Sequence, residues 1–282
     1  MKSVRFERHD SVGHIVLGNP PLNLIATAFS EHLSDAIHEA SEANIRTLLV
    51  RAEGPNFSQG GDILDFIDKE FNAWRTFISD MHHSYRKIEA LQIPTVCAVR
   101  GRAWGGAFEL ALACDLVVAA DNASFRCIEP SVGTIPVCGA VQRIAERAGP
   151  ARAARYVMLS EVMSGTTAGE LGIAAFVVPE ADVEKAAQDL AIRLANGPTR
   201  SYAAIRALLK AWSAGGVPGA DQVVLDLGMP LHNTEDARRG RTARVEAMQR
   251  GCGTGAGRFL RAVMRGGGRS SGGGAHANNG YL

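Results

Sequence analysis

The sequence predicts an α/β protein with a helical C-terminal region. Through most of the chain, short runs rich in β-branched residues alternate with segments of helical periodicity. After about Gly197 the strand-like runs end, and Ala, Leu, Arg and Glu dominate. With 282 residues, of which 46% are hydrophobic and 21% charged, the chain is long enough for one large domain with an appendage, or for two modest domains.

Strands in the core are expected at 14–17, 46–52, 94–100 and 115–120. The segment between the first two has the apolar spacing of an amphipathic helix, at Phe29, Leu33, Ile37 and Ala40. A second such helix precedes the third strand, with its apolar positions at Trp74, Phe77, Ile78, Met81, Tyr85 and Ile88. A stripe of this kind is typical of core packing, although it could also line a pocket.

Beyond the core, 198–213 and roughly 219–249 have helical patterns, so we expect domains at 1–197 and 198–250. From Gly251 the composition changes to glycine, serine and asparagine, with four arginines and no acidic residue. Such a segment buries too little apolar surface to fold, and 251–282 is therefore predicted to be a disordered tail. A flexible extension, a shifted reading frame near the end of the gene and a basic interaction tail are alternative explanations of this segment.

The balanced charge of the chain favours a small-molecule partner. Thirty Lys and Arg oppose 29 Asp and Glu, so no net field attracts nucleic acid or an anionic membrane. The N-terminal sequence MKSVRFERHDSVG lacks the apolar stretch of a signal peptide, and no later run approaches a membrane span. The chain has five cysteines, Cys97, Cys114, Cys127, Cys138 and Cys252. Their odd number and the lack of CxxC spacing indicate reduced thiols and no metal site. Reduced thiols are typical of a cytoplasmic protein.

Two glycine-rich segments follow β-rich runs and lead into predicted helices: FSQGGD at 57–62 and GRAWGGAFELALACD at 101–115. Without a Cβ atom, such turns can bring backbone N–H groups close to a ligand. Two of them could direct two donors at one oxygen, an arrangement that stabilises negative charge as it develops there. Neither segment fits the GxGxxG or GxxxxGK[ST] phosphate loops, which argues against nucleotide binding in those modes.

Glu109 and Glu129 are the candidate acid/base residues. Glu109 lies in the apolar helical sequence AFELALACDL, three residues after Gly106, where burial would raise its pKa. Glu129 precedes a proline in FRCIEPSVGTIP and could face the same cavity. Two carboxyl groups around one reacting centre could activate water and deliver a proton. A structural alternative is that Glu109 pairs with a nearby cation and Glu129 caps a turn.

Other polar residues are interpreted as structural. His82 and His83 are adjacent and point to different faces of a helix, so we expect them on the helix surface rather than in a metal or general-base site. Asp62 is expected to cap a turn or a helix.

Three ordered motifs resemble those of the enoyl-CoA hydratase (crotonase) superfamily. FSQGGD is similar to the family's FxAGAD, IPTVCAVRGRAWGGAFELALACD to IPxxAAVxGxAxGGGxELALxCD, and ASFRCIEPSVGTIP to AxFxxPExxLGxxP. The likeness runs from PPLN at 20–23 to NTEDARRGRTARVEA at 233–247. It implies a spiral of repeated ββα units whose C-terminal helices assemble into homotrimers or dimers of trimers.

The resemblance also implies a site and a reaction. Matched position by position, the backbone N–H groups of Gly61 and Gly106 would form an oxyanion hole, and Glu109 and Glu129 would be the acid/base pair. The substrate would be an acyl-CoA thioester that carries CoA itself, with no separate cofactor and no metal. Glu109 would activate a water that adds to a 2-enoyl-CoA, and Glu129 would transfer the proton at the α-carbon.

The retention of both glutamates favours a hydratase. An enoyl-CoA isomerase and an acyl-CoA decarboxylase or lyase are alternatives that use the same enolate, and a non-catalytic RNA-binding or scaffold protein is an alternative of another class. Some positions depart from the family pattern. Gly61 replaces the usual Ala, Trp104 is bulky, and Val137 stands where hydratases often have a glycine beside the catalytic water, which it could narrow or shift.

Overall fold

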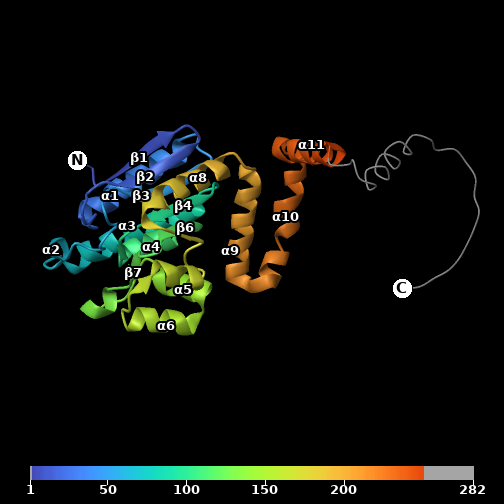
Figure 1. The fold of residues 1–282 in the computed structure, drawn as a ribbon. Helices are drawn as coiled ribbons and strands as arrows, with labels where there is room; N and C mark the ends of the chain where they lie inside the picture. Colours follow the sequence, from blue (N-terminus) through green and yellow to red (C-terminus); the bar gives the residue numbers. More distant parts are fainter. Residues whose placement is uncertain (1, 251–282) are drawn as a thin grey trace, which may run out of the picture. The chain divides into compact units, whose positions relative to one another are not determined.

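The computed structural model describes residues 2–250 (Figure 1). Its larger sheet has six strands, in the spatial order β1 (Val4–His9), β2 (Val12–Leu17), β3 (Thr47–Ala52), β4 (Thr95–Val99), β6 (Leu116–Ala120) and β9 (Phe176–Val178). The β1–β2 pair is antiparallel, and all later neighbours are parallel. The four strands expected from the sequence are therefore present as β2, β3, β4 and β6.

Helices cover the larger sheet, which explains why its inner strands are apolar along their whole length rather than alternating. Helix α8 (Val183–Ala195) packs across β2, β3, β4 and β6, while α1 (Thr27–Glu42) packs on β1 and β2. Helix α3 (Phe71–Ala90) packs in turn against α1. Both helices expected from apolar periodicity are confirmed as α1 and α3.

A smaller three-stranded sheet contains β5 (Arg102–Trp104), β7 (Ser124–Arg126) and β8 (Met163–Ser164). Helix α4 (Gly106–Leu112) begins two residues after β5 ends and carries the sequence GAFELAL. Four short elements surround this region: η1 (Glu129–Val132), α5 (Ala140–Ala148), α6 (Pro150–Met158) and α7 (Gly165–Glu170). Two more short elements are α2 (Ile63–Phe66), which leads into α3, and η2 (Glu180–Asp182), which leads into α8.

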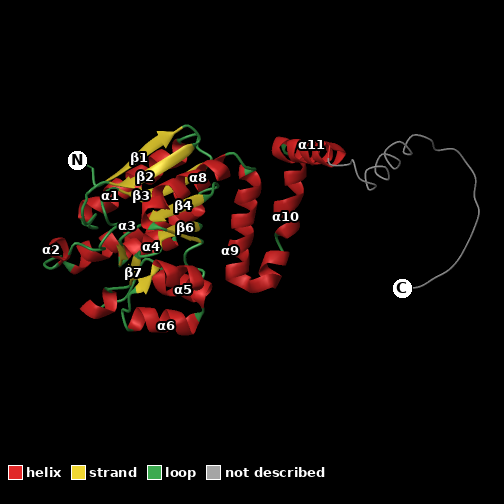
Figure 2. Cartoon of the chain, viewed as in Figure 1, coloured by secondary structure: helices red, strands yellow, loops and turns green. Residues whose placement is uncertain are grey.

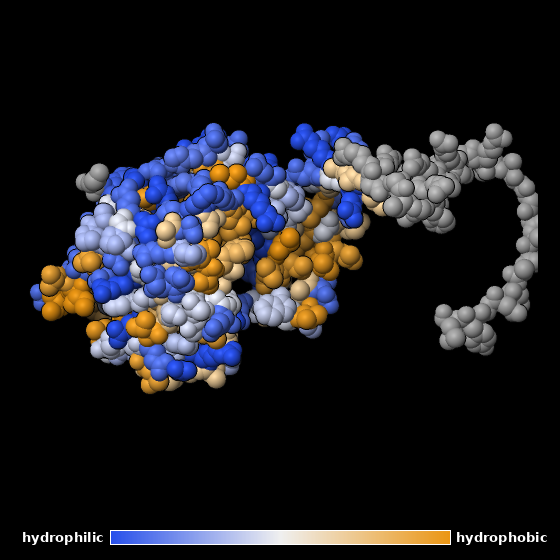
Figure 3. Space-filling model, in the orientation of Figure 1, coloured by the Kyte–Doolittle hydropathy of each residue, from blue (hydrophilic) through white to orange (hydrophobic). Residues whose placement is uncertain are grey.

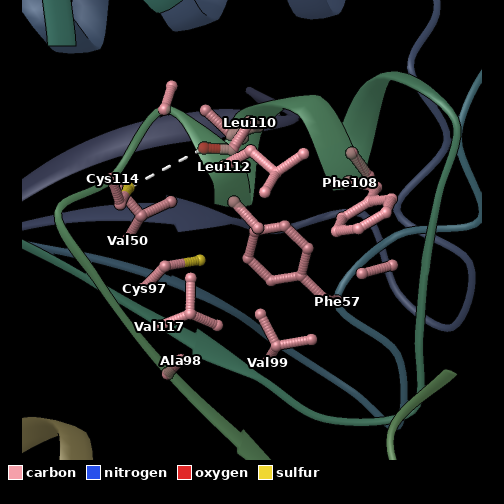
Figure 4. Packing of buried hydrophobic residues seen from close by; sticks show 14 of the residues in the cluster. Val50, Phe57, Cys97, Ala98, Val99, Phe108, Leu110, Leu112, Cys114 and Val117 are labelled. Atoms are coloured by element: carbon pink, nitrogen blue, oxygen red, sulfur yellow. Dashed lines mark hydrogen bonds between the residues drawn. The ribbon is translucent and has the colours of Figure 1, made fainter. Parts of the chain in front are cut away.

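The buried core joins α4 to the strands beside it. Figure 4 shows Phe57 and Phe108 among the aliphatic residues of β3, β4 and β6, with the Cys97 and Cys114 thiols packed in the same layer. Cys97, Cys114, Cys127 and Cys138 are all free and buried, which confirms the prediction of reduced thiols for these four. Cys252 lies outside the described residues.

The C-terminal region is helical, as expected, but its helices begin and end elsewhere (Figure 2). Helix α9 (Thr199–Asp221) continues through the gap predicted after 213, with a bend at Gly216, whose φ is 62°, beside Pro218. Helix α10 (Val224–Gly228) and η3 (Met229–Asn233) then interrupt the predicted second helix, so that α11 spans only Glu235–Arg250. The proline and glycines in this region break helices that apolar spacing alone would have continued.

Compactness divides the chain into one unit that ends at Gly228 and another that begins at Met229. Within the first unit, the Arg206 side chain of α9 donates to the carbonyl of Ile93 at 2.8 Å and pairs with Asp115 at 2.8 Å. The division at 197 and the trimerisation role of 198–250 remain predictions, and the predicted tail at 251–282 lies outside the described residues. Among the described residues, no helix is long and apolar enough to cross a membrane.

Candidate active site

An apolar cavity of about 400 Å³ lies where the glycine-rich segments meet α3 and η1. All four residues predicted for the site line it: Gly61, Gly106, Glu109 and Glu129. Among the described residues that line it, the two glutamates are the only ones with ionisable carboxyl groups, and most of the other side chains are aliphatic or aromatic. The structure therefore brings together residues that lie up to 68 positions apart in the sequence.

Backbone pairing places the two glycine segments side by side. Ser58 bridges Ala103 in parallel register, its N–H donating to the Arg102 carbonyl at 2.8 Å and its carbonyl accepting from Trp104 N at 3.1 Å. The next residues along each segment lead to Gly61 and to Gly106, the first residue of α4. Within residues 2–250, neither the Gly61 N–H nor the Gly106 N–H has a protein acceptor. Both donors remain available to a ligand in the cavity.

Glycine is required beside these donors. Gly60 has a φ of 86°, and a Cβ atom there would lie 2.6 Å from the Trp104 carbonyl oxygen. Gly105 has a φ of 55°, a conformation that costs other residues strain free energy. These angles allow the two segments to approach closely, which explains the glycine pairs that the sequence places there.

Tyr85 supports the start of α4 through a hydrogen bond to its first residue. Its buried hydroxyl donates to the Gly106 carbonyl at 2.8 Å, and burial raises the pKa of the phenol well above its ordinary value. The hydroxyl therefore stays neutral and acts as a fixed donor. The sequence placed Tyr85 in the apolar stripe of α3 and gave no signal of this contact.

Glu109 is 2% exposed and is held by the turn that precedes α5. Its Oε1 atom accepts backbone N–H groups from Cys138 at 2.8 Å and Ala140 at 3.0 Å. Burial raises the pKa of Glu109 to about 7, the negative charge of Glu129 adds to the rise, and the Ala140 and Cys138 donors oppose it. Among the described residues Glu109 forms no salt bridge, so backbone N–H groups hold its carboxyl group rather than direct contact with a cation.

Glu129 begins η1, and its side chain enters the cavity rather than capping the turn. Burial raises the pKa of this carboxyl group as well. Its Oε2 atom is buried and has no hydrogen-bond partner among the described residues. An unpaired buried carboxyl oxygen costs stability, which is typical of a group retained for chemistry.

The aromatic and Met stripe of α3 has a second role that the sequence did not decide. Phe77 and Met81 are buried, as core residues would be, yet they also line the cavity together with Trp74 and Ile78. Phe66 of α2 completes an aromatic cluster, with its ring centroid 4.6 Å from Trp74 and 5.0 Å from Phe77. The stripe is therefore both core and cavity wall.

Helix α2 extends this apolar wall to the surface. Ile63 and Ile67 line the cavity and are 56% and 70% exposed, and their neighbour Leu64 is 86% exposed. The region appears as the hydrophobic projection at the left of Figure 3, where α2 lies in Figure 1. An apolar ligand could contact side chains from the mouth of the cavity inward.

Other polar residues stand outside the cavity. The Asp62 carboxylate accepts the Leu64 N–H at 3.1 Å, which confirms it as the N-cap of α2. His82 and His83 lie on α3 and do not line the cavity.

The side chains of Glu7, His9 and His14, on the β1–β2 hairpin, are close enough together to hold a metal ion. However, Arg5 and Arg51 already pair with Glu7 at 2.8 and 3.2 Å. Arg51 also donates to His14 Nδ1 at 3.2 Å. Two cations at this cluster oppose a third, so it gives no support for a metal site.

Residues 7–250 match the family model described as enoyl-CoA hydratase/isomerase. The chain belongs to this family. It is 27% identical over 249 residues to the Bacillus subtilis (strain 168) protein named "Probable enoyl-CoA hydratase", covering 87% of this chain and 96% of that one. It is 30% identical over 213 residues to the carnitinyl-CoA dehydratase of Salmonella enteritidis, covering 75% of this chain and 82% of that one.

Its fold is also that of solved family members. The crystal structure of enoyl-CoA hydratase from Bacillus anthracis superposes with a TM-score of 0.82 at 25% identity, covering 87% of this chain and 96% of that chain. The predicted fold class, a crotonase-like α/β chain with a helical C-terminal region, is confirmed. The expected membership in an enzyme family that acts on acyl-CoA thioesters is confirmed as well.

Proposed function

We propose that this protein is an enoyl-CoA hydratase that adds water across the C2–C3 double bond of a 2-enoyl-CoA thioester. The observation that carries the proposal is the arrangement of the cavity, where two buried glutamates and two free glycine N–H groups surround one apolar space. The names of the family's members support the same reaction class.

The thioester oxygen would accept the N–H groups of Gly61 and Gly106. Negative charge develops on this oxygen when a nucleophile adds at C3, and preorganised donors of this kind contribute roughly a hundredfold or more each to the rate. Because their N–H groups have no acceptor among residues 2–250, the two glycines need break no hydrogen bond within that part of the chain to bind the substrate.

The two glutamates would divide the proton transfers. Ionised Glu109 takes a proton from water as the water oxygen bonds to C3, and the C2–C3 π electrons move into the thioester enolate. Protonated Glu129 then gives its proton to C2, which restores the thioester carbonyl. Water has thereby added its oxygen to C3 and one hydrogen to C2, and a proton moves from Glu109 to Glu129 to restore the starting state. The raised pKa values of both carboxyl groups suit this exchange near neutral pH.

The cavity wall favours a hydrocarbon acyl group. Apart from the two glutamates, no charged side chain lines the cavity within the described residues, and Phe66, Trp74 and Phe77 form one side of it. An acyl chain that carried a charge beyond C3 would lose its hydration there without gaining a partner. We therefore propose an uncharged acyl chain, presented as a CoA thioester, with no metal and no additional cofactor.

The expected assembly and location form part of the proposal. A homotrimer or a dimer of trimers, formed through 198–250, and a cytoplasmic location are supported by the family resemblance and by the reduced cysteines. Light scattering of the purified chain measures the assembly directly.

The test is an absorbance assay. Purified protein is incubated with a series of 2-enoyl-CoA thioesters of increasing chain length, and loss of the conjugated chromophore is followed for the wild type, Glu109→Gln and Glu129→Gln. The proposal expects loss of absorbance with the wild type and a rate reduced by at least about a hundredfold in either variant. Binding of the thioesters without loss of absorbance would reject the hydratase and favour an isomerase or a decarboxylase.

A further inference from the structure

We propose that Arg143 is a positioning residue that holds the Glu109 carboxylate in place through the turn before α5. This inference rests on the function proposed above for Glu109. Arg143 itself does not line the cavity, and its contribution would pass through the backbone of Cys138 and Gly139.

The turn before α5 is the element that fixes Glu109. Both donors to Glu109 Oε1, the N–H groups of Cys138 and Ala140, belong to this turn, which lies between η1 and α5. Between them stands Gly139, with a φ of 115°, and it is the N-cap of α5 without a side-chain cap. The turn therefore lacks the hydrogen bond that most often stabilises the start of a helix.

Arg143 supplies that missing support. From the first turn of α5 its Nη1 atom reaches back and donates to the Cys138 carbonyl at 2.8 Å, while its Nε atom donates to Glu89 Oε1 of α3 at 2.7 Å. The guanidinium lies so close over Gly139 that a Cβ atom there would overlap Nη1. The side chain is only 11% exposed, so its bonds are little weakened by solvent. Arg143 thus ties the turn to α3.

The same cation acts on the charge of Glu109. The titratable groups around Glu109 are Glu129, Tyr85, Cys127, Cys138 and Arg143. Burial raises the pKa of the Tyr85 phenol and of both thiols, which keeps these three groups neutral. Of these described groups, Arg143 is the one that carries a positive charge. It therefore opposes the repulsion that the Glu129 carboxylate exerts on an ionised Glu109. Its loss should both loosen the turn and make Glu109 harder to ionise.

The experiment compares Arg143→Gln and Arg143→Lys with the wild type. The ionisation midpoint of Glu109 is read by infrared titration of the carboxyl C=O band, assigned as the band that is lost in Glu109→Gln. In Arg143→Gln we expect the midpoint to rise by about one pH unit and kcat for hydration to fall about tenfold with little change in KM. Arg143→Lys keeps the charge but cannot hold both partners in fixed geometry, so the midpoint should return toward the wild type while kcat stays reduced.

Arg100→Gln is the matched control. Arg100 also pairs with one glutamate, Glu184 at 2.6 Å, and donates to backbone carbonyls, but it does not line the cavity. An unchanged Glu109 midpoint in Arg143→Gln, with a kcat loss no larger than that of the control, would overturn the inference. If Arg143→Gln fails to fold, Arg143→Lys decides, because wild-type values of both midpoint and kcat would overturn it. A wild type that hydrates none of the thioesters rejects the proposed function, whereas the infrared titration still decides the role of Arg143.

Discussion

Oε1 of Glu129 lies 3.2 Å from the position that a Cβ atom would occupy on Gly105. Gly105 also has a φ of 55°. A side chain at this position would crowd the Glu129 carboxyl group and strain the turn that delivers the Gly106 N–H. The absence of a Cβ atom on Gly105 thus serves both the donor and the acid/base residue.

Gly105→Ala should therefore lose activity beyond what backbone strain explains. We expect kcat to fall by about tenfold or more and the free energy of unfolding to fall by about 1–3 kcal/mol. Gly149→Ala is the control, since Gly149 has a φ of 89° and open space around its Cβ position. It should be destabilised to a similar extent in urea unfolding yet keep its kcat. Equal kcat losses in the two variants would show that Glu129 is not crowded.

The rate of hydration should depend on the ionisation of Glu109. Water activation needs the anionic carboxylate, and burial raises the pKa of Glu109 to about 7. Below that pH the base is protonated, so kcat/KM should rise with pH through a midpoint near 7, and it should fall again at higher pH, where Glu129 loses the proton that it gives to C2. The pH profiles of kcat and kcat/KM, measured at saturating and at limiting substrate concentrations, test this prediction. A rate that falls as pH rises through the midpoint would contradict the role of Glu109 as base.

Glu109 should also make stability depend on pH. Its pKa is raised on folding from 4.5 to about 7, so its ionisation opposes the folded state, and stability is lost as pH rises through this window. Glu109→Gln keeps an oxygen for the Cys138 and Ala140 donors but carries no charge. Relative to the wild type, it should therefore gain roughly 3 kcal/mol of unfolding free energy between the low and the high end of the window.

Urea unfolding at pH values on either side of the window measures this difference. Glu31→Gln, at an exposed position on α1, is the control for the loss of a carboxyl group in general. A constant difference between Glu109→Gln and the wild type across the window would mean that the pKa of Glu109 is not raised on folding.

The effect of a substitution at Gly61 on activity should depend on the size of the side chain at position 66. A Cβ atom on Gly61 would lie 2.8 Å from Phe66 Cε2, and the Phe66 ring is held against Trp74 and Phe77. Gly61→Ala should reduce kcat/KM by about tenfold, because the clash displaces either the ring or the Gly61 N–H. Phe66→Leu in the same chain should restore most of the loss. A double-mutant cycle in which the two effects simply add would reject the coupling.

Much of this architecture can be predicted from the sequence, because buried strands and helix faces are apolar. Strands β3, β4 and β6 are buried and therefore read as continuous apolar runs, and helices α1 and α3 carry apolar stripes. Strands β5, β7 and β8 have only two or three residues each, too few for any periodicity to appear. They were not predicted, although β5 is one of the elements that bring Gly61 and Gly106 together.

The site was predicted as residues but not as contacts. The glycine pairs and Glu109 stand out locally, since a charge in an apolar helix and glycines after a strand are both unusual. The donors to Glu109 come from Cys138 and Ala140, 29 and 31 positions later, where the apolar sequence PVCGAVQR gives no local sign of them. Arg143 likewise reads as an ordinary helix residue until its bond to the Cys138 carbonyl is seen.

The most direct test of the central claim is the source of oxygen in the product. The wild type, Glu109→Gln and Glu129→Gln are each incubated with a 2-enoyl-CoA in oxygen-18 water. The mass of the thioester product is then measured by mass spectrometry. A hydratase predicts a 3-hydroxyacyl-CoA that has gained one labelled water, formed by the wild type and lost in both variants. A product of unchanged mass, with its double bond moved and no label incorporated, would contradict hydration.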